Sequence, residues 1–164
     1  MQDLTSAMGI SKSSFYDTFS SKHDLFLSCL DLYAESNMKW AWNVLEKINS
    51  AREAISRIFQ LVIDVVIIDG DRRGCFLGNC AVEVGQRDKD VAKRVSDGFN
   101  HFSNAFAMVL QRGLDSGELT PVENSRSTAR YLVSSLNGLR IAAMASPERH
   151  HLEGIVKIVM PIVR

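Results

Sequence analysis

Proline, net charge and long apolar runs are all scarce in this sequence. Only three prolines interrupt the 164 residues, which suits long helices because proline breaks a helix interior. Lysine plus arginine and aspartate plus glutamate both total 19, so the formal net charge is zero. Nucleic-acid binders commonly carry a basic surplus. The net charge of the whole chain therefore argues against DNA binding, unless basic residues are concentrated in one part of the surface.

No apolar stretch approaches the ~18 residues of a membrane-spanning helix, and the longest, Leu61–Ile68, is interrupted by Asp64. The first residues lack the basic and apolar regions of a signal peptide. The three cysteines, Cys29, Cys75 and Cys80, are odd in number and do not have the spacing of a secreted disulfide framework. We therefore expect reduced thiols, a cytoplasmic location and no membrane partner.

Helical periodicity dominates the rest of the pattern. Hydrophobic residues make up 46% of the chain, enough to build a packed core. They recur at helical spacing from end to end, without a convincing alternating strand, repeat or low-complexity tract. The length fits one domain, or a small domain attached to a larger one. The sequence therefore predicts an all-α fold.

Capping residues mark the expected helix boundaries. Gly85 and Gly117 are expected to end helices, and Pro121 to form a turn. Ser146 followed by Pro147 predicts the start of the last helix, with proline at its first position. The other expected helix starts share a Ser or Asp N-cap, at Ser11, Ser21, Ser50 and Asp88.

Residues 4–22 have the form of a helix-turn-helix. Gly9 can adopt the positive φ that the tight turn needs. Phe15 and Phe19 lie four residues apart and would pack the second helix against the first. The polar residues of that second helix, Lys12, Ser13, Ser14 and Tyr16, are then left facing outward, where a recognition helix meets the major groove.

This segment resembles the TetR family of bacterial transcriptional regulators. The likeness covers the first 26 residues closely, and the remainder matches in helix count, length and order. The residues that carry it are Gly9, Ile10, Ser11, Lys12, Ser13, Ser14, Phe15, Tyr16, Phe19, Ser21 and Lys22. The resemblance implies a partial helix-turn-helix DNA-binding domain in residues 1–26 and a TetR-type helical ligand-binding and dimerisation domain in residues 27–164. In that alignment Met1 falls inside the family's second helix, so its first helix is expected to be missing.

Double-stranded operator DNA is the partner that this reading implies. We expect Lys12 and Lys22 to contact phosphates and so to set affinity and salt dependence. Ser13 and Ser14 are small enough to let the helix approach base edges, and Tyr16 would reach a phosphate or a thymine methyl. Asp3, Asp17 and Asp24 offset the two lysines, so the fragment itself is not basic.

The resemblance also implies a homodimer formed by the last two helices of each subunit. Two recognition helices must reach successive major grooves, roughly 34 Å apart. The sequence allows such an interface through small residues that permit close helix approach and leucines that supply apolar area. These residues are Ala129, Gly138, Ala142 and Ala143, with Leu132, Leu136 and Leu139.

A pocket for a small-molecule inducer, largely apolar, is expected among the middle helices. Asn79 and Glu83 share one helix face, and Asn137 and Arg140 share another. The aromatic candidates for its walls are Trp40, Phe59, Phe76, Phe99, Phe102 and Phe106. The alternatives are that the aromatic stripe is ordinary core and that Arg140 forms a structural ion pair with Glu83.

Cys75 suggests a second alternative, a thiol-based redox or electrophile sensor. It follows Arg72, Arg73 and Gly74 near an expected helix start, and both positive charge and the helix dipole lower a thiol pKa. On this hypothesis Cys75 would be alkylated faster than Cys29 or Cys80. The competing interpretation is a small buried hydrophobic residue.

Enzyme chemistry finds no support in the motifs. The sequence has no nucleophile elbow, phosphate loop, dinucleotide fingerprint or zinc-protease motif, so we expect no catalytic residue and no cofactor. A calcium loop starting at Asp69 fails because Cys80 stands where the bidentate glutamate belongs. His150 and His151 are adjacent and should point apart on a helix, so no metal site is expected. The sequence predicts a DNA-binding repressor released by an inducer; the other alternative is a helical dimeric protein-interaction module.

Overall fold

The computed structural model describes residues 1–120 and 124–164, and within these ranges the chain is helical throughout, without a strand. The predicted all-α fold is therefore confirmed. The elements in chain order are α1 (Gln2–Met8), α2 (Lys12–Thr18), α3 (Lys22–Lys47), α4 (Ala51–Ile67), α5 (Phe76–Glu83), α6 (Lys89–Asp115), α7 (Ser125–Ala145), α8 (Arg149–Val159) and the 3₁₀ turn η1 (Met160–Ile162). Among the described residues, every helix is too short or too polar to cross a lipid bilayer.

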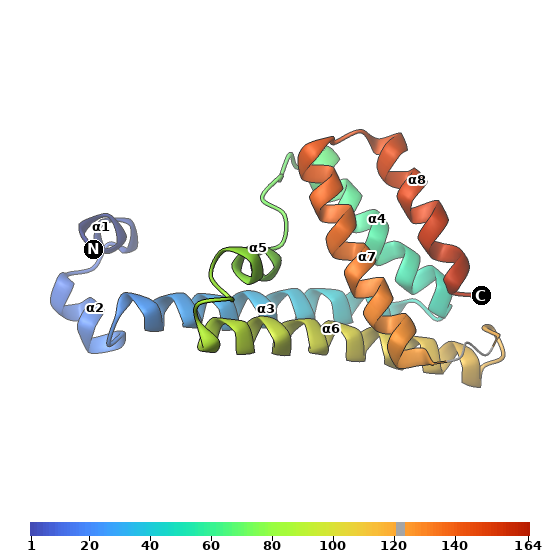
Figure 1. The fold of residues 1–164 in the computed structure, drawn as a ribbon, viewed down its shortest axis with the longest axis horizontal. Helices are drawn as coiled ribbons and strands as arrows, with labels where there is room; N and C mark the ends of the chain where they lie inside the picture. The colour runs from blue at the N-terminus through green and yellow to red at the C-terminus, as the bar shows by residue number, and fades with distance from the viewer. Residues whose placement is uncertain (121–123) are drawn as a thin grey trace.

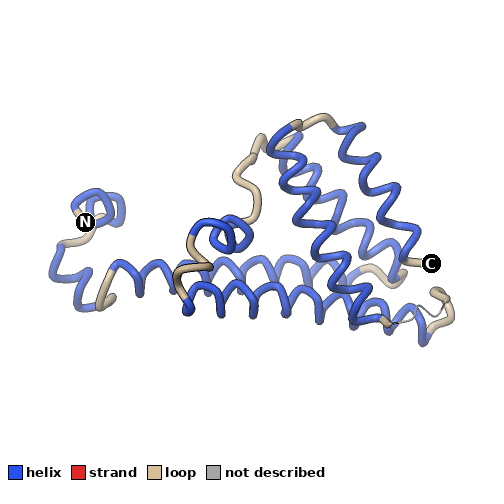
Figure 2. Tube along the Cα trace, viewed as in Figure 1, coloured by secondary structure: helices blue, strands red, loops and turns tan. Residues whose placement is uncertain are grey.

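The long helices α3 and α6 run side by side and form the axis of the molecule (Figure 1). Helices α4, α7 and α8 pack together at one end of this pair, and α5 lies along its middle. Helices α1 and α2 sit at the opposite end, beyond the start of α3, joined to it by short loops (Figure 2). The short N-terminal unit is thus held away from the main helical body.

Side-chain caps start four of the helices as predicted. The hydroxyls of Ser11, Ser21 and Ser50 accept hydrogen bonds from backbone N–H groups three residues ahead. Asp88 accepts two such bonds, from the N–H groups of Asp90 and Val91. Each cap satisfies donors that the first helical turn cannot pair internally.

The predicted start of the last helix was wrong. Helix α8 begins at Arg149, with Glu148 as its N-cap residue, so Pro147 lies before the helix. The N–H of Ser146 donates instead to the carbonyl of Ala142 and closes α7. Serine occurs at both ends of helices, and here the backbone of Ser146 continues the hydrogen bonding of α7 instead of starting α8. The turn predicted at Pro121 lies outside the described residues.

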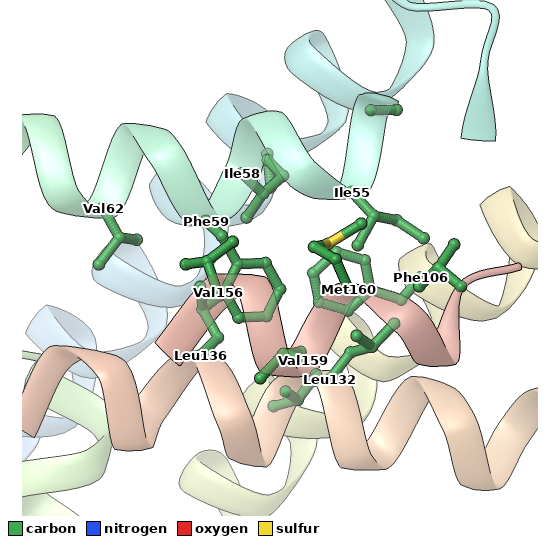
Figure 3. Packing of buried hydrophobic residues seen from close by; sticks show 14 of the residues in the cluster. Ile55, Ile58, Phe59, Val62, Phe106, Leu132, Leu136, Val156, Val159 and Met160 are labelled. Atoms are coloured by element: carbon green, nitrogen blue, oxygen red, sulfur yellow. The ribbon is translucent and has the colours of Figure 1, made fainter. Parts of the chain in front are cut away.

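Helix α4 is the centre of the main core. It packs against α3, α6, α7 and α8, and Ile55, Ile58 and Phe59 are completely buried. Figure 3 shows these side chains among Leu132 of α7 and others from α6 and α8. Burying each large apolar side chain contributes about 1.5–3 kcal/mol before entropy is counted, so α4 holds the helical body together.

A glycine lets α6 approach α4 closely. A Cβ on Gly113 would lie 2.7 Å from the Cβ of Ala51 and 2.6 Å from a methyl of Leu119, closer than carbon atoms can pack. Leu119 is buried in the same core. The backbone after α6 therefore folds back onto the first turn of α4.

Glu118, in that returning segment, caps α4 from outside the helix. Its carboxylate accepts hydrogen bonds from the Ser50 hydroxyl at 2.6 Å, the Ala51 N–H at 2.7 Å and the Arg52 N–H at 3.0 Å. Burial raises the pKa of Glu118, but these three hydrogen bonds outweigh it, and the pKa lies below its ordinary value. The negative charge also faces the positive end of the helix dipole.

Replacing Glu118 by alanine should lower the free energy of unfolding by about 1 kcal/mol, the usual effect of losing a helix cap. Urea titration at neutral pH measures it. Because the folded-state pKa of Glu118 is lowered, its contribution is present above the unfolded pKa and lost as the pH falls through the folded value. The matched control is Glu46→Ala, which removes an exposed carboxylate of α3; equal losses for the two variants would contradict the capping role.

Candidate DNA interface and ligand cavity

The turn between α1 and α2 has the geometry that the sequence predicted. Gly9 has a φ of 65° and ends α1 in the left-handed conformation, which glycine adopts without steric cost. Phe15 of α2 is completely buried, and its ring lies 5.5 Å from that of Phe19. The inner face of α2 is therefore aromatic and buried.

The five side chains predicted to meet DNA are all exposed. Lys12, Ser13, Ser14 and Tyr16 lie on the outer surface of α2, and Lys22 is the first residue of α3. The hydroxyls of Ser13 and Ser14 lie 2.8 and 2.9 Å from the hydroxyl of Ser11. The start of α2 therefore presents a small cluster of hydroxyls next to Lys12, which suits phosphate and base-edge contacts.

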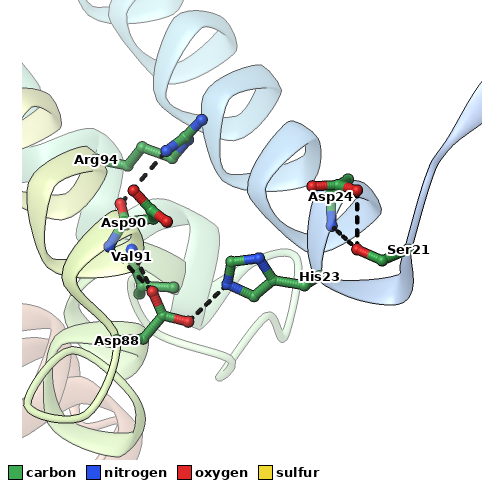
Figure 4. Close-up of polar contacts among 7 residues, drawn as sticks. All are labelled: Ser21, His23, Asp24, Asp88, Asp90, Val91 and Arg94. Atoms are coloured by element: carbon green, nitrogen blue, oxygen red, sulfur yellow. Dashed lines mark hydrogen bonds and ion pairs between the residues drawn. The ribbon is translucent and has the colours of Figure 1, made fainter.

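A polar link joins the start of α3 to the start of α6 (Figure 4). Nε2 of His23 lies 2.6 Å from Oδ2 of Asp88, whose other oxygen caps α6. The hydrogen bonds from the Val91 N–H and from His23 hold the pKa of Asp88 below its usual range. No sequence pattern revealed this contact, because its partners are 65 residues apart.

A cavity of ≈ 280 Å³ opens between α3, α4, α7 and the loop before α5, and we call it the central cavity. Its polar lining comes from Tyr33 and Asn37 of α3, Asp71 and Arg140; its apolar lining comes from Trp40 and from α4. The α4 residues are Leu61, Val62, Val65 and Val66. Trp40 and Arg140 were predicted. The others were missed, although Tyr33, Asn37 and Trp40 share the spacing of one helix face.

Two further spaces adjoin the central cavity and also have Arg140 in their walls. An inner cavity of ≈ 20 Å³ is lined by the predicted Phe99, Phe102 and Asn137. A groove of ≈ 200 Å³ along α5 is lined by the predicted Asn79, Glu83 and Asn137. Most of the predicted polar residues thus gather around Arg140. Asn79 also donates to the carbonyl of Arg73, which fixes the loop before α5.

Three predicted wall residues do not line these spaces. Phe59 and Phe106 are completely buried in the main core, so for them the ordinary-core alternative is correct. Phe76 packs edge-to-face against Phe26 and Tyr33. The proposed ion pair between Glu83 and Arg140 is absent from the described residues, since Glu83 is exposed and forms no salt bridge there.

Two polar groups near Arg140 have unusual surroundings. Burial raises the pKa of Tyr33, whose hydroxyl oxygen accepts a hydrogen bond from the Phe76 N–H at 3.3 Å. The side-chain nitrogen of Asn137 donates to the carbonyl of Val133. Its oxygen Oδ1 is buried without a donor among the described residues. A buried acceptor of this kind is costly unless a ligand or water supplies a donor.

The solvent exposure of the three cysteines is the opposite of what the sensor hypothesis requires. Cys29 is exposed, whereas Cys75 and Cys80 are buried. Cys75 stands at the N-cap position of α5, as predicted, but only 7% of its surface is exposed. Burial raises the pKa of the Cys80 thiol. The geometry therefore favours Cys75 as a packed wall residue of the inner cavity.

The two adjacent histidines were expected to point apart, and this was wrong. The rings of His150 and His151 lie 4.0 Å apart at the start of α8. One ligand atom from each, with one from Glu148, falls within 4.8 Å of the others. Both rings turn toward Glu148, because its Oε2 lies 4.0 Å from Nδ1 of His150 and 3.4 Å from Nδ1 of His151. All three side chains are exposed, and exposed groups of this kind are common without an ion.

The outward surface of α7 and α8 differs from the predicted dimer surface. Ala129, Leu132, Leu136, Leu139 and Ala143 are buried in the chain's own core, so they do not face outward. Gly138 is exposed and Ala142 half-buried. Periodicity shows that a helix has an apolar face, but here that face is buried in the core of its own subunit.

The family follows from comparison with known proteins. A family model described as "Tetracyclin repressor-like, C-terminal domain" matches residues 51–159. The HTH-type transcriptional regulator YezE of Bacillus subtilis (strain 168) is 31% identical over 164 residues, covering 99% of this chain and 84% of that protein. The chain belongs to the TetR family. It is thereby a DNA-binding transcriptional regulator, as the helix-turn-helix predicted, and neither the adaptor nor the thiol-sensor alternative is favoured.

Solved structures of TetR-type regulators share the fold. The reduced form of E. coli NemR superposes with a TM-score of 0.89 at 20% identity, covering 99% of this chain and 86% of NemR. A cysteine mutant of CifR complexed with 26-base-pair operator DNA has a TM-score of 0.84 at 25% identity, covering 98% and 84%. FadR from Bacillus subtilis, complexed with stearoyl-CoA, has a TM-score of 0.75 at 13% identity, covering 98% and 84%.

Alkylation of the folded protein with iodoacetamide should modify Cys29 first. Cys75 and Cys80 should react at least about tenfold more slowly, because a buried thiol must wait for local opening of the structure. Peptide mass spectrometry against time measures the three rates, and the urea-unfolded chain, in which all three should react alike, is the control. Faster labelling of Cys75 than of Cys29 would revive the sensor hypothesis.

Proposed function

We propose that this TetR-family protein is a cytoplasmic, non-enzymatic repressor that a small molecule releases from its operator. Residues 1–26 form the DNA-binding part and residues 27–164 the sensing and dimerisation part. One observation carries the proposal: α3 begins beside the exposed surface of α2 and continues into the wall of the central cavity. A ligand that favours one position of α3 would thereby alter the position of α2.

In this proposal the exposed surface of α2 enters the major groove. Lys12 and Lys22 supply phosphate contacts, while Ser13, Ser14 and Tyr16 approach the bases or the sugar-phosphate edge. The chain's zero net charge is no obstacle, since the lysines need only dominate locally. The regulator CifR, captured with operator DNA, gives the precedent for such a complex in this fold.

Replacing Lys12 by alanine should weaken binding to specific and random DNA alike, by several-fold at ~0.1 M salt. Each subunit of a dimer loses one phosphate contact, so the slope of log K against log salt should fall by about two. Fluorescence anisotropy with the protein and DNA from upstream of its gene measures both. Lys39→Ala, on the exposed side of α3, is the control and should change neither.

Dimerisation would use an outward stripe on α7 and α8 rather than the leucines first expected. The exposed residues of α7 recur at alternating steps of three and four and include Tyr131, Gly138 and Ile141. Gly154 and Ile158 continue the surface on α8, and Ile141 and Ile158 are 67% and 78% exposed. No atom lies within 4 Å of a Cβ built on Gly138 or Gly154. Small residues flanked by isoleucines suit the close packing of two helix pairs.

Replacing Gly138 by glutamate should convert the dimer to monomer. The new side chain meets open space within its own subunit, so the monomer should stay folded, but two such charges would meet near the dimer axis. Sedimentation equilibrium measures the mass, and circular dichroism reports folding. Ser96→Glu, on the exposed side of α6, adds the same charge away from the stripe. A Gly138→Glu protein that remains dimeric would contradict this interface.

A further inference from the structure

Arg140 is an uncompensated charge at the centre of the cavities. It is half-buried on α7 and belongs to the walls of the central cavity, the inner cavity and the α5 groove. Within residues 1–120 and 124–164, no carboxylate lies within 4.0 Å of it and no hydrogen bond from its guanidinium is formed. The donors of this guanidinium are therefore available to an occupant of the cavities.

The acidic residues nearest in these walls do not compensate this charge. Asp71 shares the central cavity with Arg140, but it accepts hydrogen bonds from the Arg73 guanidinium at 2.9 and 2.7 Å. Those bonds lower the pKa of Asp71 to about 2, so it is ionised and already paired. Glu83, in the α5 groove, is exposed to solvent.

Donors and acceptors are also free around Arg140. The Tyr33 oxygen accepts from the Phe76 N–H, and its own O–H lies beside the Cys75 thiol, a weak acceptor that a carboxylate can replace. Burial raises the pKa of Tyr33, so the phenol keeps that proton at neutral pH. Asn137, one turn before Arg140 on α7, holds the buried and unpartnered acceptor Oδ1. The central cavity thus offers a cation and a hydroxyl, and the adjoining inner cavity offers one acceptor.

The other end of the central cavity is apolar. Trp40 of α3 faces Leu61, Val62, Val65 and Val66 of α4 across it. The ≈ 280 Å³ volume lies near the lower limit of ligand pockets, which is roughly 300 Å³. The occupant must therefore be small and two-ended.

We propose that the central cavity binds a small amphipathic monocarboxylate, with its carboxylate against Arg140 and Tyr33 and its apolar body between Trp40 and α4. The inference deepens the proposed function by naming the chemical class of the inducer, and it rests on that function for its regulatory meaning. A planar carboxylate matches the guanidinium fork with two parallel hydrogen bonds. A phosphate dianion fits less well, because its second charge would meet the ionised Asp71 in the same cavity.

Three compounds of similar shape test the proposal: 4-phenylbutanoate, its neutral amide and 3-phenylpropyl phosphate. Trp40 is the reporter, and a Trp42→Phe background makes it the sole tryptophan of the chain. Binding is followed by Trp40 fluorescence and repeated by calorimetry, without DNA. The carboxylate should bind about tenfold or more tightly than the amide, as expected when a charged hydrogen-bonded pair is gained, and more tightly than the phosphate.

Substitutions locate the preference. Arg140→Gln, which keeps a polar side chain but removes the charge, should bring the carboxylate and the amide to equal affinity. Arg140→Lys should keep part of the preference, because an ammonium lacks the planar fork, and Tyr33→Phe should weaken carboxylate binding several-fold. Arg130→Gln, an exposed arginine of the same helix, is the matched control and should leave the preference intact.

Equal affinity of the unsubstituted protein for carboxylate and amide would overturn the proposal. So would a preference that survives Arg140→Gln, tighter binding of the phosphate, or no binding of the carboxylate at about 10 mM. Because the titrations contain no DNA, a protein that binds the carboxylate selectively but never binds operator DNA would contradict the proposed function alone. A protein that binds DNA but not the carboxylate would contradict this inference alone.

Discussion

The burial of α4 among four other helices is the constraint on which the rest of the molecule depends. Ile55, Ile58, Phe59 and Ile63 are completely inaccessible to solvent, and they fill the space between α3, α6, α7 and α8 (Figure 3). Close-packed interiors of this kind resist gradual deformation. The α4 wall of the central cavity is therefore held in place, and a ligand there meets a largely formed apolar surface.

The sequence predicted the elements well but not which side of each helix would be used. Caps such as Ser50 and Asp88 and the turn at Gly9 are local chemistry, and each lies where it was expected. Phe59 and Phe106 satisfy the same periodicity whether they line a cavity or fill a core. The choice depends on which helices face them, and that is a property of the whole fold. Tyr33 and Asn37 were missed because polar residues inside a long helix resemble ordinary surface residues until α7 brings Arg140 to them.

Two partly buried arginines differ in whether the chain itself supplies partners for their guanidinium groups. Arg112 of α6 donates to the carbonyls of Leu45 and Ile48 at the end of α3, where unpaired carbonyls and the helix dipole attract a cation. Both terminal nitrogens of its guanidinium are thus paired within the chain, and only Nε is buried without a partner among the described residues. Arg140 has no comparable acceptor among the described residues and faces open space instead. Composition alone could not separate them, since both are single arginines in apolar stripes.

The length of α3 has a mechanical consequence. The helix spans 26 residues, which corresponds to about 39 Å at the rise of an α-helix. A tilt of only about 3° around its far end would displace its first turn by about 2 Å over that length. In the proposed function, Trp40 would lie near the fixed end of α3 and Lys22 near the displaced end, so a small tilt at the cavity would become a larger displacement beside the DNA. The contact between His23 and Asp88 would oppose such a tilt, because it ties the start of α3 to the start of α6.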